Sequence, residues 1–170
     1  RLKILIDSDM ALYACHLPLD KHPEVGNNAQ LANLLGLKER KAFGIYHGIS
    51  IGWSGVLPKP TKLDQIIAKI LPDGSAAKSV IAAGPKEIKT VAIVSGGAPF
   101  ESLEAITEGI DLYITGEPSH SIYHYLIEGG INFIAAGHYA TEVWGVKEIA
   151  EKAHAELGLD TIFLDIPTGL

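Results

Sequence analysis

The sequence predicts a layered α/β fold in which helices cover sheets of mainly parallel strands. Five short apolar segments rich in β-branched or aromatic residues are expected to be buried strands. These segments are Ala11–Cys15, Thr90–Val94, Asp111–Thr115, Ile131–Ala136 and Thr161–Ile166. Segments with helical spacing of apolar residues separate most of them. Alternating strands and helices are typical of α/β proteins, whose functional sites lie at the carboxyl ends of strands.

The elements follow in chain order. Residues 1–8 are expected to be the last turns of a helix, because the apolar segment beginning at Ala11 is the better strand. Phe43–Val56 is rich in glycine and has alternating apolar positions, which predicts a pair of extended strands. Apolar residues recur at helical spacing in five further segments, each predicted to be a helix. These are Val25–Leu35, Thr61–Leu71, Pro99–Thr107, Ser119–Glu128 and His138–Leu157.

The chain length fits one domain or a compact domain of two lobes. Pro72-Asp73-Gly74-Ser75 is a turn or short linker that divides a first part, residues 1–71, from a second, residues 75–170. The chain begins with Arg1 rather than methionine, so we expect it to lack an N-terminal stretch of a longer protein. An incomplete sheet would expose strand edges, and this part alone would then behave poorly in solution.

Composition narrows the classes of function. Of the 170 residues, 47% are hydrophobic, but no apolar segment approaches the roughly 20 residues of a membrane span. The net charge is −6, and the densest basic segment, Lys38–Lys41, contains an acid, so binding to nucleic acid is disfavoured. Cys15 is the only cysteine, which excludes an internal disulfide and is typical of a cytoplasmic protein. A metal would therefore be held by His, Asp and Glu, which favours zinc, iron, manganese or nickel over copper(I).

His138 and Glu142 form the clearest candidate site. They follow the strand Ile131–Ala136 and Gly137, at the start of a predicted helix. Residues four apart lie on one face of a helix, so the imidazole and the carboxylate should point to the same place, as metal ligands. The alternative is a solvated histidine and glutamate at a helix N-terminus.

A second candidate group lies in His16-Leu17-Pro18-Leu19-Asp20, which also follows an apolar segment. Pro18 turns the backbone away from the sheet, so that His16 and Asp20 can enter a cleft. The alternative is that Asp20 only caps a turn. Downstream, Asn27 and Asn28 either orient a ligand or cap the helix that begins there.

Glu117 follows the strand Asp111–Thr115 and precedes another helix. It is either a general base beside a metal, or an acid placed in a first helical turn by the helix dipole. Ser95-Gly96-Gly97 lies between a strand and a helix and is a weak candidate for binding phosphate through backbone N–H groups. His120 and His124 have no carboxylate partner and are expected at the surface or behind a site. Buried packing is the better interpretation of Cys15.

With these motifs identified, the chain resembles the YbgI-like (NIF-three-like) dinuclear-metal proteins, which often carry the name type-2 GTP cyclohydrolase I. The resemblance runs nearly end to end. It is carried by five motifs: His16–Asp20, Gly26–Gln30, Thr115–Glu117, Gly137–Glu142 and Phe163–Pro167.

The resemblance implies two divalent metal ions in a cleft, with Asp20, His138 and Glu142 as ligands and His16 behind them. It also implies a two-lobed subunit in a ring-shaped homohexamer. Family members carry a paired-histidine motif upstream of where this chain begins, and no His-His occurs here, so the chain holds part of the site.

The function that follows from the resemblance is a metal-dependent hydrolase acting on a nucleotide or a related heterocycle, with Glu117 as a candidate proton shuttle. One alternative is a protein that binds or delivers metal without catalysis. A second is a scaffold or regulator. The sequence identifies neither the metal nor the substrate.

Overall fold

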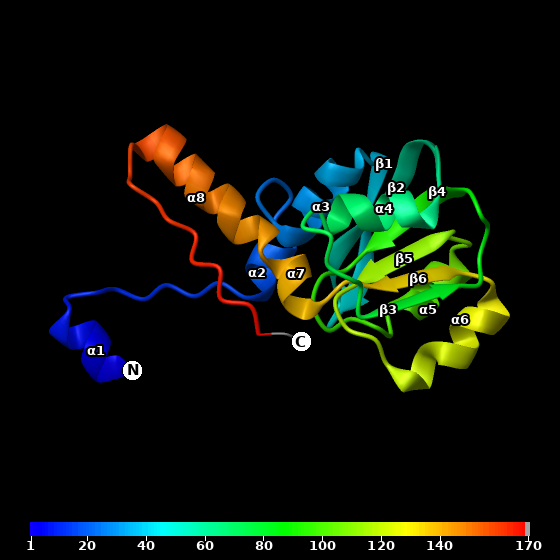
Figure 1. The fold of residues 1–170 in the computed structure, drawn as a ribbon, viewed down its shortest axis with the longest axis horizontal. Coiled ribbons are helices and arrows are strands. Elements are labelled where there is room, and N and C mark those ends of the chain that lie inside the picture. The colour runs from blue at the N-terminus through cyan, green and yellow to red at the C-terminus, as the bar shows by residue number, and fades with distance from the viewer. Residues whose placement is uncertain (169–170) are drawn as a thin grey trace.

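The computed structural model describes residues 1–168 and contains one six-stranded mixed sheet with helices on both faces (Figure 1). The strand order is β1-β2-β4-β5-β6-β3. The strands are β1 Lys38–Tyr46, β2 Ile49–Thr61, β3 Ser79–Ala82, β4 Ile88–Ile93, β5 Leu112–Thr115 and β6 Asn132–Ala135.

The sheet is parallel only in its centre. β4 pairs with β5 and β5 with β6 in parallel, whereas β1–β2, β2–β4 and β3–β6 are antiparallel. The α/β fold with a mixed sheet is confirmed, but two parallel pairings out of five are fewer than expected. The predicted pair of strands over Phe43–Val56 explains part of the difference. It is the hairpin β1–β2, whose loop residues His47 and Gly48 both have positive φ, and a tight hairpin always pairs its strands antiparallel.

The helices are α1 Leu2–Asp7, α2 Leu17–Asp20, α3 Asn27–Leu35, α4 Leu63–Ile70, α5 Ser102–Thr107, α6 Tyr123–Gly129, α7 His138–Glu142 and α8 Trp144–Leu157, with a 3-10 turn η1 at His120–Ile122. Each predicted helix is present, usually shorter than expected. The last is divided at Val143 into α7 and α8. The helix expected at the start of the chain is α1, which lies apart from the sheet (Figure 1).

Two predicted strands are wrong, and one strand was not predicted. Ala11–Cys15 and Thr161–Ile166 have no regular structure. Their apolar side chains are largely exposed, with Leu12 at 75% and Ile162 at 79%, and neither segment pairs with the sheet. β3 is an edge strand whose side chains are at most half-buried, so its pattern lacks the continuous apolar character of a central strand.

Alternate residues of the central strands build two apolar layers. Val91, Ile93, Leu112, Ile114 and Ile134 face α3 and α4, while Ala92, Tyr113, Phe133 and Ala135 face α5 and α6, together with Val94 just after β4. Burying each large side chain contributes about 1.5–3 kcal/mol, which fixes the register of the three parallel strands. Their carboxyl ends therefore meet at one edge of the sheet.

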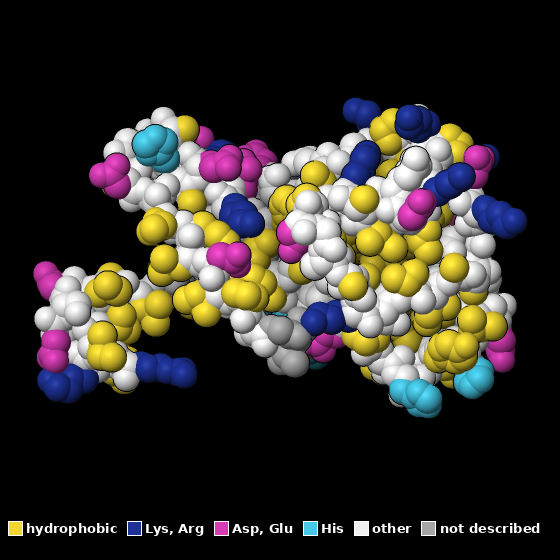
Figure 2. All heavy atoms as spheres, in the orientation of Figure 1, with side chains coloured by type: hydrophobic (Ala, Val, Ile, Leu, Met, Phe, Trp, Pro, Cys, Tyr) yellow, Lys and Arg dark blue, Asp and Glu magenta, His cyan; other side chains and the backbone are white. Residues whose placement is uncertain are grey.

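Residues 1–71 supply β1 and β2, and residues 75–170 supply the other four strands of the same sheet. The division into two lobes at Pro72–Ser75 remains a prediction. Hydrophobic side chains are exposed on α1 and along the segment that follows it (Figure 2). Within residues 1–168, no helix has the length and apolar character needed to cross a membrane.

Candidate functional site

Three turns lie at the carboxyl ends of the parallel strands and are bonded to one another. The turn after β4 contains Gly96, the turn after β5 contains Gly116, and the turn after β6 contains Gly137. The backbone N–H of Gly116 donates to the Gly96 carbonyl at 2.9 Å, and that of Gly137 donates to the Gly116 carbonyl at 2.9 Å. This places the residues that follow each turn side by side, as expected for a site at the end of a parallel sheet.

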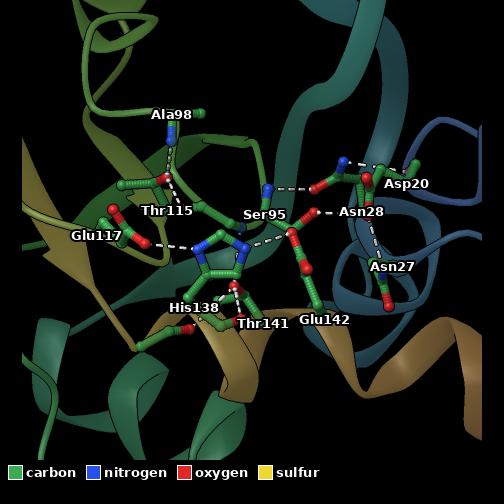
Figure 3. Close-up of polar contacts among 12 residues, drawn as sticks. Asp20, Asn27, Asn28, Ser95, Ala98, Thr115, Glu117, His138, Thr141 and Glu142 are labelled. Carbon is green, nitrogen blue, oxygen red and sulfur yellow. Dashed lines mark hydrogen bonds and ion pairs between the residues drawn. The ribbon is translucent and has the colours of Figure 1, made fainter. Parts of the chain in front are cut away.

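His138 and Glu142 occupy successive turns of α7, which begins directly after Gly137. The imidazole Nε2 lies 3.2 Å from Glu142 Oε1. Figure 3 marks this contact with a dashed line. Gly137 has φ 114°, a backbone conformation that side-chain-bearing residues rarely adopt, and it turns the chain from β6 into α7. The prediction that the two side chains share one helix face is confirmed.

Asp20 reaches the same place from the last position of α2. Its side chain is buried at 6% exposure, and its Oδ1 accepts hydrogen bonds from Asn27 Nδ2 at 2.7 Å and from Ser95 Oγ at 3.4 Å. A buried carboxylate held by such donors has a fixed orientation. Asp20 therefore does more than cap a turn.

Asn27 and Asn28 tie the elements around the site together, and neither side chain caps α3. The Asn27 side chain accepts from the backbone N–H of Gly145 at 2.7 Å, which joins α3 to α8. The Asn28 side chain accepts from the backbone N–H of Ser95 at 2.7 Å and donates to the Ile51 carbonyl at 2.8 Å. Asn28 thus fixes α3 against β2 and against the turn after β4.

The four residues predicted near a metal are brought together. His16, Asp20, His138 and Glu142 line one cleft of about 260 Å³. Asp20 and Glu142 are drawn with their network in Figure 3. His16 is exposed at the rim of this cleft.

Glu117 contacts His138 on the other ring nitrogen, with Oε1 2.6 Å from Nδ1. Glu117 belongs to the segment between β5 and η1 and precedes the first helical residue, so the helix-dipole interpretation is not supported. In Figure 3 the two carboxylates flank the imidazole from opposite sides. A carboxylate on Nδ1 holds the proton there, which leaves the lone pair of Nε2, on the side of Glu142, available to a metal ion.

Acidic groups dominate the electrostatics. Burial, and after it the charge of Asp20, raises the pKa of Glu142, while His138 and His16 partly oppose this. Burial lowers the pKa of His138, but the hydrogen bond to Glu117 and the charge of Glu142 outweigh it, so that the pKa is raised overall. Two carboxylates facing one cleft repel each other, and a cation between them would relieve that repulsion.

The donor atoms are carboxylate oxygens and imidazole nitrogens, which fit zinc, iron, manganese or nickel. Across residues 1–168, however, no three His, Cys, Asp or Glu side chains gather closely enough to hold an ion by themselves. The donor chemistry fits a metal, and the set is incomplete.

The turn Ser95–Gly97 is not arranged to bind phosphate as the sequence suggested. The backbone N–H of Ser95 is bonded to Asn28, and that of Gly96 is bonded to Thr141 Oγ1 at 3.0 Å, so the turn does not offer these groups to a phosphate. His120 and His124 are exposed, as expected. Cys15 is free and only half-buried.

Sequence reasoning missed Thr141 and the space that Gly96 provides. Thr141 Oγ1 accepts a hydrogen bond from the backbone N–H of Gly96 and can donate one to the Gly137 carbonyl at 3.0 Å. A Cβ atom on Gly96 would collide with Glu142 Oε1 and lie 3.2 Å from His138 Nε2. Nothing local in the sequence signals either contact.

A family model described as Duf34/NIF3 (NGG1p interacting factor 3) matches residues 1–168. The GTP cyclohydrolase 1 type 2 homolog of Archaeoglobus fulgidus is 44% identical over 170 residues, covering 100% of this chain and 67% of that protein. The Pyrococcus abyssi protein of the same name is 47% identical over 173 residues, covering 100% of this chain and 68% of that protein.

Solved structures of similar proteins share the fold of this chain. The protein ybgI, described as of unknown function, superposes with a TM-score of 0.87 at 37% identity, over 98% of this chain and 66% of that one. A protein from Thermus thermophilus gives a TM-score of 0.81 at 40% identity, over 99% of this chain and 66% of that one. This chain thus spans about two thirds of the length of the proteins it matches.

Proposed function

This chain belongs to the Duf34/NIF3 family, and on that premise we propose that it forms part of a dinuclear-metal hydrolase acting on a nucleotide or a related heterocycle. The observation that carries the proposal is the cleft shared by Asp20, His138 and Glu142. The name GTP cyclohydrolase 1 type 2 homolog, given to the relatives, supports the substrate class.

Three residues of this chain would act as metal ligands. Among the donors to the two divalent cations, Asp20 and Glu142 would supply oxygens and His138 would supply Nε2. The other positions would be filled by donors that residues 1–168 do not contain, or by water. When bound, a divalent cation supplies Lewis acidity, which lowers the pKa of water toward neutrality.

Glu117 has two roles in this proposal. It holds the proton on His138 Nδ1, since Glu117 Oε1 lies 2.6 Å from that nitrogen. Because its side chain is also 49% exposed, it can exchange a proton with a substrate or with water. His16, at the rim of the cleft, would stand behind the three ligands.

A second candidate function is metal binding or delivery without catalysis. The observation that favours it is the openness of the site: the His138 side chain is 39% exposed. Ions held by few, accessible nitrogen and oxygen donors can exchange. Tight, non-exchanging metal together with robust turnover would exclude this function.

Self-association into a homohexameric ring in the cytoplasm is also proposed. The exposed apolar side chains support it: Ile45 and Ile49 on the edge hairpin are 63% and 51% exposed, and Leu2 and Ile6 on α1 are 75% and 77% exposed. Light scattering of the full-length protein tests the oligomeric state.

The test of the main proposal uses the full-length protein that contains this chain. Elemental analysis should find about two divalent metals per subunit, and metal-loaded protein should turn over GTP or a related nucleotide. Bound metal without turnover of any nucleotide would favour metal delivery. Absence of metal would remove both functions.

A further inference from the structure

We propose that a second hollow beside the metal cleft, between Glu117 and Phe163, binds a planar heterocycle that carries ring N–H donors, such as a guanine-type base. This inference rests on the proposed hydrolase function and specifies where and how its substrate ring would bind.

The hollow has a volume of about 520 Å³ and two unlike walls. Glu117, His138 and Glu142 form the polar wall, and Val146, Phe163 and Leu164 form the apolar wall. Pockets of about 300–1,000 Å³ with mostly apolar lining and a few convergent polar groups are typical of small-molecule sites.

His138 and Glu142 line both this hollow and the cleft that contains Asp20. They therefore stand between the two spaces. A ring bound in the hollow would present its edge to the side chains proposed to hold the metal, and the rest of the molecule would remain outside. This adjacency is what a reaction on a heterocycle requires.

Phe163 is fixed in position although its segment has no helix or strand. After Phe163, the Tyr139 hydroxyl donates to Asp165 Oδ1 at 2.7 Å and accepts from the backbone N–H of Ile166 at 2.9 Å. Before it, Thr161 Oγ1 donates to the Ala150 carbonyl at 3.2 Å.

The Phe163 ring is also covered from outside the hollow. Lys147 Nζ lies 4.6 Å from the ring centroid, and Lys147 lines a different cavity. Lys147 therefore contacts the Phe163 ring without entering the hollow. Phe163 itself lines the hollow, so its ring can stack on a planar ligand bound there.

The charge of the polar wall selects the ligand. No lysine or arginine is among the described residues that line the hollow, whereas two glutamates are. A phosphate would be repelled there, and N–H groups would be attracted. Glu117 uses Oε1 on His138, which leaves Oε2 to accept from a ring N–H. A guanine ring offers such N–H groups on one edge.

The experiment is calorimetry with guanosine, which has no phosphate, on the full-length metal-loaded protein. Phe163→Ala should weaken binding at least about fivefold, because base stacking on an aromatic ring is worth roughly that much or more. Phe163→Tyr should restore it. Ile162→Ala is the matched control: its side chain is 79% exposed, adjacent in sequence and outside the hollow. It should bind as the wild type does.

The N–H requirement is tested with 1-methylguanosine, which lacks one ring N–H. It should bind at least about tenfold more weakly than guanosine, because a hydrogen bond to a charged acceptor is lost. Equal binding of the two nucleosides, equal binding by Phe163→Ala, or no binding of guanosine at all would overturn the assignment.

The outcomes separate this inference from the function on which it rests. Guanosine binding that depends on Phe163, without nucleotide turnover by the wild type, keeps the hollow and removes the hydrolase. Turnover with an unchanged KM in Phe163→Ala keeps the hydrolase and overturns the hollow.

Discussion

The carboxylates of Asp20 and Glu142 line the same cleft from helices at opposite ends of the chain, α2 and α7. Burial, followed by the charge of Asp20, raises the pKa of Glu142. The fold therefore places the Asp20 carboxylate close enough to Glu142 to disfavour ionisation of Glu142, with His138 beside it. Such an arrangement is unfavourable without a cation and favourable with one.

Removing either carboxylate should reduce bound metal with little loss of fold. Glu142→Ala removes both carboxylate oxygens. Asp20→Asn replaces one oxygen by an amide nitrogen and removes the charge, and the asparagine can still accept the hydrogen bond from Asn27. Elemental analysis of the full-length variants should show less metal per subunit than the wild type. Asp64→Asn, an exposed change on α4, is the control and should retain it. Unchanged metal content in both cleft variants would contradict the ligand assignment.

Asn28→Ala should destabilise the protein by at least about 2 kcal/mol, because the Ser95 N–H and the Ile51 carbonyl would lose their buried partner. For a protein of this size that lowers the Tm by roughly 4–8 °C. Thermal unfolding followed by circular dichroism measures it. Asn33→Ala, on the exposed side of the same helix, should shift the Tm much less. Equal shifts would show that Asn28 does not fix the turn.

The Gly96→Ala variant should unfold at a lower denaturant concentration than the wild type and should bind less metal. Gly96 has φ 69°, where a Cβ costs about 1–2 kcal/mol, and that Cβ would also collide with Glu142. Gly74→Ala is the matched control, because Gly74 has φ 77° and no heavy atom would lie within 4 Å of an added Cβ. The excess loss of stability in Gly96→Ala isolates the collision. Full metal binding by that variant would argue against Glu142 as a ligand.

Tyr139→Phe should loosen the C-terminal segment while leaving the sheet intact. The change removes the hydrogen bonds that the hydroxyl makes with Asp165 and with the backbone N–H of Ile166. Hydrogen exchange should become faster at the Ile166 amide and stay unchanged in β5. Tyr125→Phe, at an exposed position on α6, should change neither rate. Unchanged exchange at Ile166 in Tyr139→Phe would show that other contacts hold the segment.

Tyr113 should remain protonated when the exposed tyrosines ionise. Burial raises its pKa well above the usual value, and its hydroxyl donates to the Ala98 carbonyl at 2.6 Å. Because the folded-state pKa is raised, the stabilisation is present below the unfolded pKa of about 10 and is lost as the pH rises through the folded value. In the wild type, absorbance titration should show that one of the six tyrosines does not ionise before alkaline unfolding. In Tyr113→Phe this delayed step should be absent. Ionisation of every wild-type tyrosine near pH 10 would contradict the buried environment.

Much of the fold was predictable from local pattern. The three parallel strands are continuous apolar segments, and α4 has apolar residues at helical spacing, so the burial of each is encoded in consecutive residues. Ala11–Cys15 and Thr161–Ile166 show the limit. Their composition resembles that of the true strands, but no neighbouring strand lies beside them. Pairing is not a property of the segment itself.

The same division holds for the site. Sequence alone determined that His138 and Glu142 share a helix face, because a spacing of four is a local property of the helix, and family resemblance identified Asp20 as their partner. Only the tertiary structure decided that Asp20 is held by Asn27 and Ser95, that Asn28 locks the turn after β4, and that Glu117 bonds to His138 Nδ1. These contacts join residues far apart in the chain, and their geometry depends on packing the two apolar layers that bring three strand ends to one edge.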